Sequence, residues 1–235
     1  MDIIKIFSTA QKMSAIRRYS QIHLLKEESV LEHTGFVCLF SYLLCHELNT
    51  KATNNLTEHM DIGEVLCKAV THDIDEVVTG DIPRPTKYFD ENSKKTFDKI
   101  SEAGMEKLLE EMNLQISVNL KLQRDWGNSK KGNEGVIIAI ADLASVVFKI
   151  WDEVILLGNQ KLIPQGIQAI EYLNALKRYV DNSDMNNDQI KVIENIVEQL
   201  KEICEIVKEK DQEGFGSFAP LKSYRHQQIE ESINA

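Results

Sequence analysis

Residues 136–144 read VIIAIADLA, and this stretch does most to decide the fold of the chain. Apolar residues fill nearly every position, without the alternation of apolar and polar residues that a half-buried strand requires. We therefore predict a central helix over residues 134–157 that is buried on several sides. Asp142 lies in its middle, where an unpartnered charge would be costly to bury.

The rest of the chain is patterned in the same helical way. Apolar residues recur at intervals of three and four, and Gly and Pro are sparse, so we predict an all-α fold. A capping box at Ser29 and Glu32 marks one helix start, and Asp61 marks another. Two prolines within residues 81–88 should make a stiff, extended turn. Helices are expected over residues 2–17, 29–49, 61–80, 93–112, 134–157, 164–181 and 187–210, while residues 113–132 show no decided pattern.

Size and charge narrow the class of protein. A chain of 235 residues with 43% hydrophobic content suffices for one domain, which we place at residues 1–210, before a tail at residues 211–235 that is loosely ordered or packed on the surface. The net charge of −10 disfavours nucleic-acid polymers and membranes as partners, and no run approaches the ~18 apolar residues of a membrane span. Four cysteines occur singly in apolar helical contexts, which indicates free thiols in a cytoplasmic protein: Cys38, Cys45, Cys67 and Cys204.

Four polar residues in apolar helical surroundings are the main indication of function. His72 and Asp73 are adjacent in the third expected helix, His33 lies in the first turn of the second, and Asp142 lies in the central helix. A single buried histidine is usually a hydrogen-bonded core residue, and Asp142 alone could pair with Lys149 or an arginine. Taken together, the four residues predict a metal site whose ligands come from three helices.

The donor types indicate the class of metal ion but not its identity. Two imidazoles and two carboxylates suit a divalent ion such as Mn²⁺, Co²⁺, Fe²⁺, Ni²⁺, Zn²⁺ or Mg²⁺, and they leave positions for water and a phosphate oxygen. The remaining histidines are expected to be exposed and outside the site: His23, His46, His59 and His226.

The motifs extend beyond these ligands. Arg18-Tyr19 precedes His33 by fifteen residues, residues 72–88 read HDIDEVVTGDIPRPTKY, and residues 141–143 read ADL. These stretches resemble the bacterial HD-domain 5′-deoxynucleotidases of the HD-domain phosphohydrolase superfamily, with coverage of about residues 7–160. The resemblance implies a single-domain HD-type helical bundle that removes phosphate from deoxynucleoside 5′-monophosphates as a homodimer. It also implies one metal ion, because binuclear HD proteins carry extra histidines before the final aspartate and this chain has none between His72 and His226.

Phosphate chemistry and the resemblance assign roles to further residues. Arg18 is a candidate bidentate clamp on the phosphate, with capping of the first helix as the alternative. Glu76, one helical turn after His72, is expected to hold the attacking water or protonate the departing oxygen, with an exposed charge as the alternative, and Asp75 is expected to be solvated. By resemblance, Asp81 belongs to the catalytic and substrate-contacting set, and Lys87 adds positive potential near the phosphate.

Tyr19 departs from the family, whose bacterial members carry tryptophan next to the deoxyribose. A smaller ring with a hydroxyl still packs on a sugar or base, which leaves the preference between deoxyribose and ribose open.

Two other functions also stay open. One is a deoxynucleoside triphosphate hydrolase, acting for example on dATP, for which the candidate phosphate-binding cations are Arg18, Arg84, Lys87, Lys94 and Lys95. The other is a nucleotide-binding module without turnover. The presence of both Glu76 and Asp81 favours catalysis.

Overall fold

The computed structural model describes residues 2–53, 56–212 and 214–218, and within them the chain is all-α, as predicted. The only extended pairing in this part of the chain is a single bridge between Arg17 and Ser29. The longer helices are α1 (Ile3–Ala15), α2 (Val30–Thr50), α3 (Ile62–Thr71), α6 (Glu91–Met112), α7 (Ile116–Gly127), α8 (Gly132–Trp151), α9 (Ile163–Ala175) and α11 (Asn187–Lys208). The shorter elements are η1 (Leu56–Glu58), α4 (Glu76–Thr79), α5 (Arg84–Lys87), η2 (Asp152–Leu156), η3 (Gln160–Leu162), α10 (Lys177–Asp181) and η4 (Phe215–Phe218).

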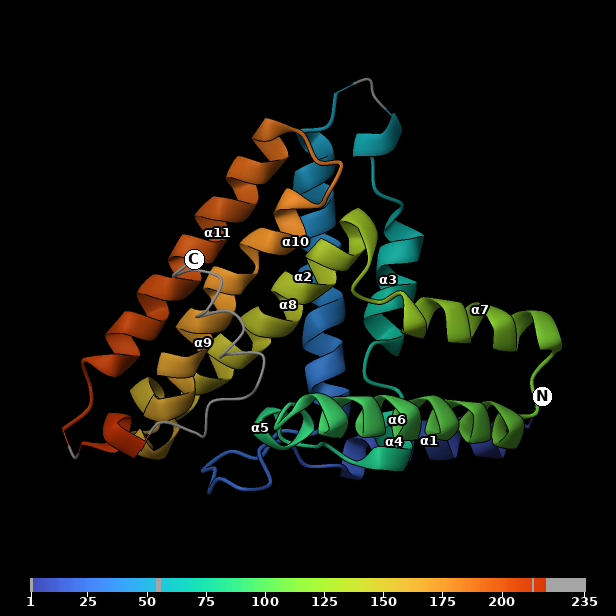
Figure 1. Ribbon diagram of the computed structural model, residues 1–235, viewed down its shortest axis with the longest axis horizontal. Helices are drawn as coiled ribbons and strands as arrows, with labels where there is room; N and C mark the ends of the chain where they lie inside the picture. Colours follow the sequence, from blue (N-terminus) through green and yellow to red (C-terminus); the bar gives the residue numbers. More distant parts are fainter. Residues whose placement is uncertain (1, 54–55, 213, 219–235) are drawn as a thin grey trace.

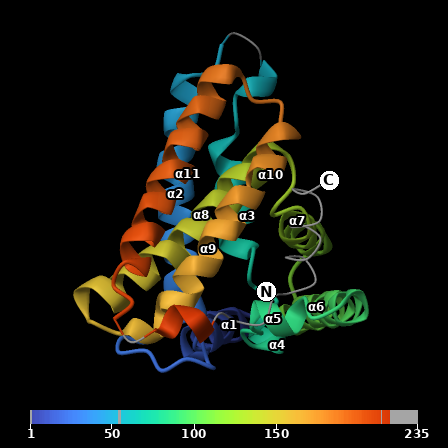
Figure 2. The ribbon, with the colours of Figure 1, turned by 60° about the vertical axis from the view of Figure 1, so that its left-hand side comes forward.

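Helix α8 is the centre of the bundle. It crosses α2 and contacts α3 on one side, and it packs against α9 and α11 on the other (Figures 1 and 2). Residues Val136 to Ala141 of α8 are all buried, which confirms the predicted central helix. The large core around α8 therefore fixes α2, α3 and α8 relative to one another, and these are the helices that carry the predicted metal ligands.

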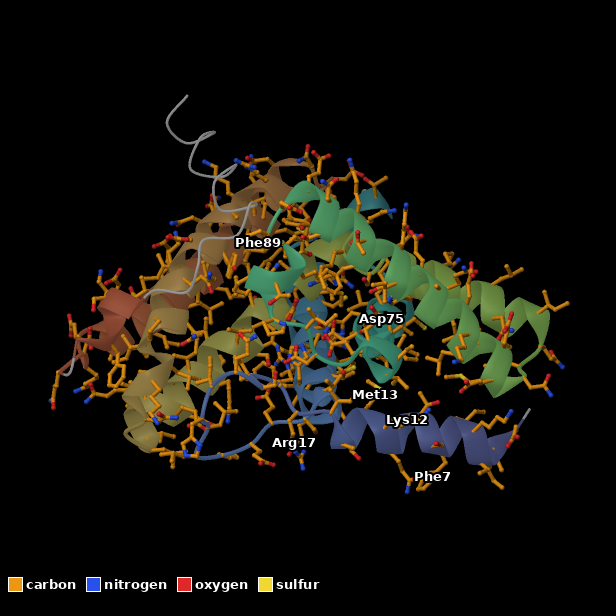
Figure 3. The ribbon with its side chains drawn as sticks, turned by 60° about the horizontal axis from the view of Figure 1, so that its bottom comes forward. Phe7, Lys12, Met13, Arg17, Asp75 and Phe89 are labelled. Atoms are coloured by element: carbon orange, nitrogen blue, oxygen red, sulfur yellow. The ribbon has the colours of Figure 1, made fainter. Side chains whose placement is uncertain are left out.

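A second, smaller layer covers one end of the bundle. Helices α6 and α7 project beyond the bundle, and α1 runs beside α6 (Figures 1 and 3). A separate apolar cluster centred on Met105 and Leu108 of α6 receives Trp126 from α7. The segment between α3 and α6, which holds α4 and α5, is thus held between the bundle and this layer.

The helix starts follow the predicted caps. Ser29 and Glu32 form a complete capping box at the start of α2, and the Asp61 carboxylate accepts the amides of Gly63 and Glu64 at the start of α3. Both starts lie within one residue of the predicted positions. His33 consequently sits in the first turn of α2, as expected.

The prediction of an unbroken third helix to Gly80 was wrong. Helix α3 ends at Thr71, and tight turns lead to α4 at Glu76. The His72 ring explains the break, because its Nδ1 lies 2.7 Å from the Ala69 carbonyl, the acceptor that a continuing α-helix would offer to the Asp73 amide.

Other boundaries also differ from those expected. The turn predicted at residues 81–88 is extended only at its start and then forms α5, since Pro85 is tolerated in a first helical turn. The undecided stretch holds α7, and the expected helix at residues 164–181 is divided into α9 and α10. The central helix ends in the π-type turn η2, in which the Leu157 amide bonds to the Asp152 carbonyl.

Other expectations concern the surface and the thiols. No helix of the described segments combines the length and apolar character needed to cross a bilayer. The four cysteines are free thiols, with Cys45 and Cys204 buried. Most of the predicted tail, His226 included, lies outside the described residues.

Candidate metal centre

Three helical segments bring the predicted ligands together. The Nε2 atoms of His33 and His72 are 3.2 Å apart, and Asp73 Oδ2 lies 3.4 Å from His33 Nε2 and 3.2 Å from His72 Nε2. Asp142 Oδ1 lies 3.4 Å from His33 Nε2. Both imidazole rings are fully buried, whereas the two carboxylates are partly exposed. The cluster therefore opens toward solvent on its carboxylate side.

The spacing of these donors suits a bound cation. Two ligand atoms about 2.1 Å from one ion and at bond angles of 90–110° lie roughly 3.0–3.4 Å apart, and the observed separations fall in this interval. His33, His72 and Asp73 form a compact set of potential ligand atoms, and Asp142 adjoins this set through its contact with His33. The four residues thus fit a divalent metal.

Hydrogen bonds on the far side of each ring fix the orientation of the histidines. His33 Nδ1 lies 2.8 Å from the Ser145 hydroxyl, and His72 Nδ1 donates to the Ala69 carbonyl. With Nδ1 of His72 protonated, Nε2 of the neutral ring keeps its lone pair for a metal. Ser145 was not predicted, although it lies one turn after Asp142 on the same helix.

The charges in the cluster stabilise one another. The two histidines hold the pKa of Asp73 well below its usual range, although its burial acts in the opposite direction. Burial also opposes protonation of His72, but Asp73 and Asp142 raise its pKa overall. The carboxylates therefore stay ionised, which is the state that ligates a metal.

Asp142 pairs with Lys130 at 2.5 Å rather than with Lys149. Lys130 precedes α8, and its backbone packs so closely on Gly135 that a Cβ there would clash with the Lys130 carbonyl group. Lys130 also draws the pKa of Asp142 well below its usual range against the effect of burial. No periodic signal marks Lys130, so sequence reasoning missed this cation.

Arg18 lies at the edge of the cluster and is only 12% exposed. Its guanidinium bonds to the Glu28 carboxylate at 2.6 Å, and its amide donates to the Glu28 carbonyl. The neighbouring Arg17 is instead exposed and pairs with Glu27. Arg18 is therefore an oriented cation beside the metal ligands and not a cap on α1, which ends at Ala15.

Tyr19 adopts a left-handed backbone conformation with φ of 60°. This geometry is costly for a bulky residue, and it aims the Tyr19 amide at Asp81 Oδ2, 3.0 Å away. The Tyr19 hydroxyl is buried and has no hydrogen-bond partner among the described residues. Burial raises the pKa of this hydroxyl, so it is a protonated donor that lacks an acceptor.

Glu76 faces the same region from the start of α4. Its Oε2 is buried without a hydrogen-bond partner in the described part of the chain. Burial, followed by the negative charges of Asp73 and Asp81, raises the pKa of Glu76 to about 10. Burial, followed by the charge of Asp73, raises the pKa of Asp81, where Arg18 and the Tyr19 amide oppose them. Near neutral pH, Glu76 therefore carries a proton.

Several predicted roles for neighbouring residues change. Asp75 was expected to be solvated, but it is buried and accepts a hydrogen bond at 3.0 Å from Nε1 of Trp126 on α7. The side chain of Lys87 makes no ion pair or hydrogen bond with the cluster within the described residues. Arg84 stacks on the ring of Tyr172, 4.5 Å from its centroid.

The other cations proposed for triphosphate binding lie on α6. Lys94 pairs with Asp98, and Lys95 pairs with Glu91 in the preceding turn. His23, His46 and His59 are exposed, as predicted.

A helical bundle in which two histidines and two aspartates converge from separate helices defines an HD-domain hydrolase. Solved structures show the same fold: an HD-domain phosphohydrolase from Listeria innocua aligns with a TM-score of 0.63 at 19% identity, over 100% of this chain and 99% of that one. A protein from Pyrococcus horikoshii aligns with a TM-score of 0.62 at 18% identity, over 86% of this chain and 99% of that one.

The family is defined more closely by the sequence. Residues 5–182 match the family described as 5′-deoxynucleotidase YfbR-like, and the chain belongs to that family. It is 25% identical to a 5′-deoxynucleotidase of Pectobacterium atrosepticum over 65% of this chain and 74% of the relative. A 5′-deoxynucleotidase of Vibrio vulnificus is 32% identical over 44% of this chain and 51% of the relative. The chain is thus a phosphohydrolase of an established nucleotide-hydrolysing family, whose fold implies a divalent metal.

Proposed function

We propose that this protein removes the 5′-phosphate from nucleoside monophosphates at the centre formed by His33, His72, Asp73 and Asp142. The observation that carries the proposal is the convergence of His33, His72 and Asp73 at separations of 3.2–3.4 Å, with Asp142 3.4 Å from His33 and the largely buried Arg18 beside them. A single divalent ion held there would supply a Lewis acid and a bound water of lowered pKa. The donor set suits Mn²⁺ or Co²⁺ as well as Zn²⁺.

Two cationic residues near the four ligands would bind the phosphate group. Arg18 presents a planar donor pair to the phosphate oxygens, and Glu28 keeps that guanidinium oriented. Lys130 adds a second cation near Asp142. Neutralising the phosphate lowers its repulsion of an incoming water, which is the main obstacle to hydrolysis of a phosphomonoester.

The leaving nucleoside needs a proton on its 5′ oxygen. Glu76 is suited to donate it, because burial raises the pKa of this carboxyl and its Oε2 has no other partner in the described segments. Asp81 anchors the Tyr19 amide through Oδ2, which leaves its second oxygen for a hydroxyl of the sugar. Water attack on phosphorus breaks the bond to the 5′ oxygen, which takes the proton of Glu76, and the proton that the attacking water loses restores Glu76; the products are the nucleoside and inorganic phosphate.

We further propose that the protein acts in the cytoplasm as a homodimer. The free thiols support a reducing compartment. The dimer rests on the family resemblance described above.

Substrate screening with purified protein tests the proposal. The metal-free protein is assayed with each ribo- and deoxynucleoside 5′-monophosphate and with dATP, after addition of Mn²⁺, Co²⁺ or Mg²⁺. Phosphate release from monophosphates in a metal-dependent manner is expected, and Glu76→Gln should bind the metal yet lose at least about 100-fold in kcat. Turnover of dATP with none of dAMP would instead support a triphosphate hydrolase.

Ligand replacement tests the metal centre itself. Asp73→Asn should reduce bound metal, measured by elemental analysis, because it removes the charge that both histidines surround. Lys87→Ala is the matched control and should retain the metal. A full complement of metal in Asp73→Asn would overturn the ligand assignment.

A further inference from the structure

The loop at residues 19–28 connects the candidate phosphate clamp Arg18 to the start of α2, with Tyr19 at its beginning and Glu28 at its end. Its first half packs on the apolar core through Ile22 and Leu24. Its second half, residues 26–28, lines one side of a partly open cleft of about 200 Å³, and α2 and α8 line the other side. Apolar packing therefore holds only the first half of the loop against the bundle.

A buried carboxylate holds the second half of the loop. Glu153, in the turn η2 after α8, is fully buried. Its Oε1 accepts the Lys26 amide at 2.8 Å, and its Oε2 accepts the Leu25 amide at 2.9 Å. Leu25 itself is more than half exposed, so Glu153 holds this part of the loop through its backbone amides.

Two further side chains complete this anchor. Lys149 Nζ donates to Glu153 at 3.0 Å and also to the Lys26 carbonyl. Asn159 Nδ2 donates to Glu153 at 2.7 Å and to the His23 carbonyl at 2.9 Å. These donors outweigh the cost of burial and hold the pKa of Glu153 at about 2, so it remains a carboxylate. Isolated buried charges are costly, and this one is fully partnered by the loop and its supports.

The two ends of the loop are paired with each other by backbone hydrogen bonds. The Arg18 amide donates to the Glu28 carbonyl, and the Val30 amide donates to the Ile16 carbonyl. The loop is therefore held at two places. Its two ends are paired with each other at the base, and Leu25 and Lys26 between them are bonded to Glu153. Glu28 follows Lys26 by two residues, and its carboxylate orients Arg18.

We propose that Glu153 is a positioning residue for substrate binding, which acts through the loop at residues 19–28 to hold the Arg18–Glu28 pair beside the metal centre. The inference rests on the proposed phosphomonoester hydrolysis. Glu153 touches neither the substrate nor the metal ligands. Its contribution is the fixed geometry of the arginine, and a displacement of about 1 Å at such a group lowers the rate by up to about 100-fold.

A double-mutant cycle tests the coupling. Glu153→Gln should lower kcat/KM for the monophosphate that the wild-type protein hydrolyses by about 10- to 100-fold, mostly through KM, with bound metal unchanged. In an Arg18→Ala background the same substitution should change kcat/KM by less than about twofold. Equal losses in both backgrounds would overturn the inference, because Glu153 would then act independently of Arg18.

The matched control is Asp125→Asn on α7. Asp125 is likewise a buried carboxylate in ion pairs, here with Lys121 and Arg124, and it lies outside the loop and its supports. This variant should lose stability and leave KM unchanged. A rise in KM equal to that of Glu153→Gln would show that general destabilisation causes the effect.

Hydrogen exchange of the wild-type protein provides a test that needs no folded variant. The amides of Leu25 and Lys26 should be protected, although the Leu25 and Lys26 side chains are exposed, and their rapid exchange would overturn the inference. If the wild-type protein hydrolyses no phosphomonoester, the proposed function and the inference both fail. If it hydrolyses one and the cycle is additive, the inference alone fails.

Discussion

At the scale of single residues, the hydroxyl of Tyr19 bears most directly on substrate choice. It is a buried donor without an acceptor in the described residues, and such a group costs about 1–3 kcal/mol until a partner arrives. A sugar hydroxyl of the substrate is a suitable acceptor, because the Tyr19 amide is fixed on Asp81 beside the cluster.

Removing that hydroxyl should therefore change sugar selectivity. We expect Tyr19→Phe to lower kcat/KM for AMP by about tenfold, as for one lost hydrogen bond, and to leave dAMP within about twofold. Steady-state assays with both nucleotides measure the ratio, and bound metal serves as the control. Equal losses on the two substrates would place the hydroxyl against a group that they share.

Glu76 makes a prediction about pH and stability in the metal-free protein. Its pKa of about 10 in the fold lies above the ordinary value of 4.5, so the folded state binds this proton more tightly. Its contribution to stability is complete below about pH 4.5 and is lost as the pH rises toward 10. Thermal unfolding at pH 6 and pH 9 should give a lower Tm at the higher pH.

The variant Glu76→Gln should reduce this dependence, because a glutamine mimics the protonated carboxyl. A remaining slope is expected from His72, whose raised pKa acts in the same direction. An unchanged difference in Tm between the two pH values would contradict a protonated Glu76 in the folded protein.

At the scale of elements, the short segment between α4 and α5 depends on Gly80. This residue has φ of 71°, a conformation that side chains rarely adopt, and an added Cβ would meet no atom within 4 Å. Gly80→Ala should therefore cost roughly 1 kcal/mol in the free energy of unfolding through backbone strain alone. Denaturant unfolding measures it.

Gly35 is the matched control for that substitution. It lies within α2, and an added Cβ there also meets nothing within 4 Å. Gly35→Ala should stabilise the protein by about 0.5–1 kcal/mol, since alanine favours a helix. The same sign of change in both variants would contradict the strained turn before Asp81.

Strong periodicity allowed the main helices to be predicted, whereas local competition for hydrogen bonds did not show in the sequence. The apolar run before Asp142 and the cap at Ser29 predict α8 and α2 closely. The break after α3 was missed because it depends on the His72 ring taking a carbonyl from its own helix. Lys130 was missed for a similar reason, since only the close contact with Gly135 brings it to Asp142.

At the scale of the whole molecule, α1 presents an unusual apolar surface. Ile3, Ile4 and Phe7 are each more than 60% exposed, and Phe7 points away from the body of the protein (Figure 3). Exposed groups of large apolar side chains are typical of surfaces that another protein covers. The proposed homodimer gives this surface a partner.

Light scattering after size exclusion tests the dimer. We expect the wild-type protein to have twice the mass of one chain and Phe7→Ser to shift toward the monomer at low concentration, because a buried phenylalanine contributes about 1.5–3 kcal/mol. Lys12→Ser, on the same helix, is the control. A dimer equally strong in Phe7→Ser would exclude α1 from the interface.

The anchor on Glu153 also restricts how the length of the chain can vary. Because Leu25 and Lys26 are held at one point and Glu28 at another, an insertion between Lys26 and Glu28 would shift the carboxylate away from Arg18. Extra residues between Tyr19 and His23 would leave the spacing from Lys26 to Glu28 unchanged. Natural length variation among related proteins should accordingly fall in the first half of the loop and spare the second.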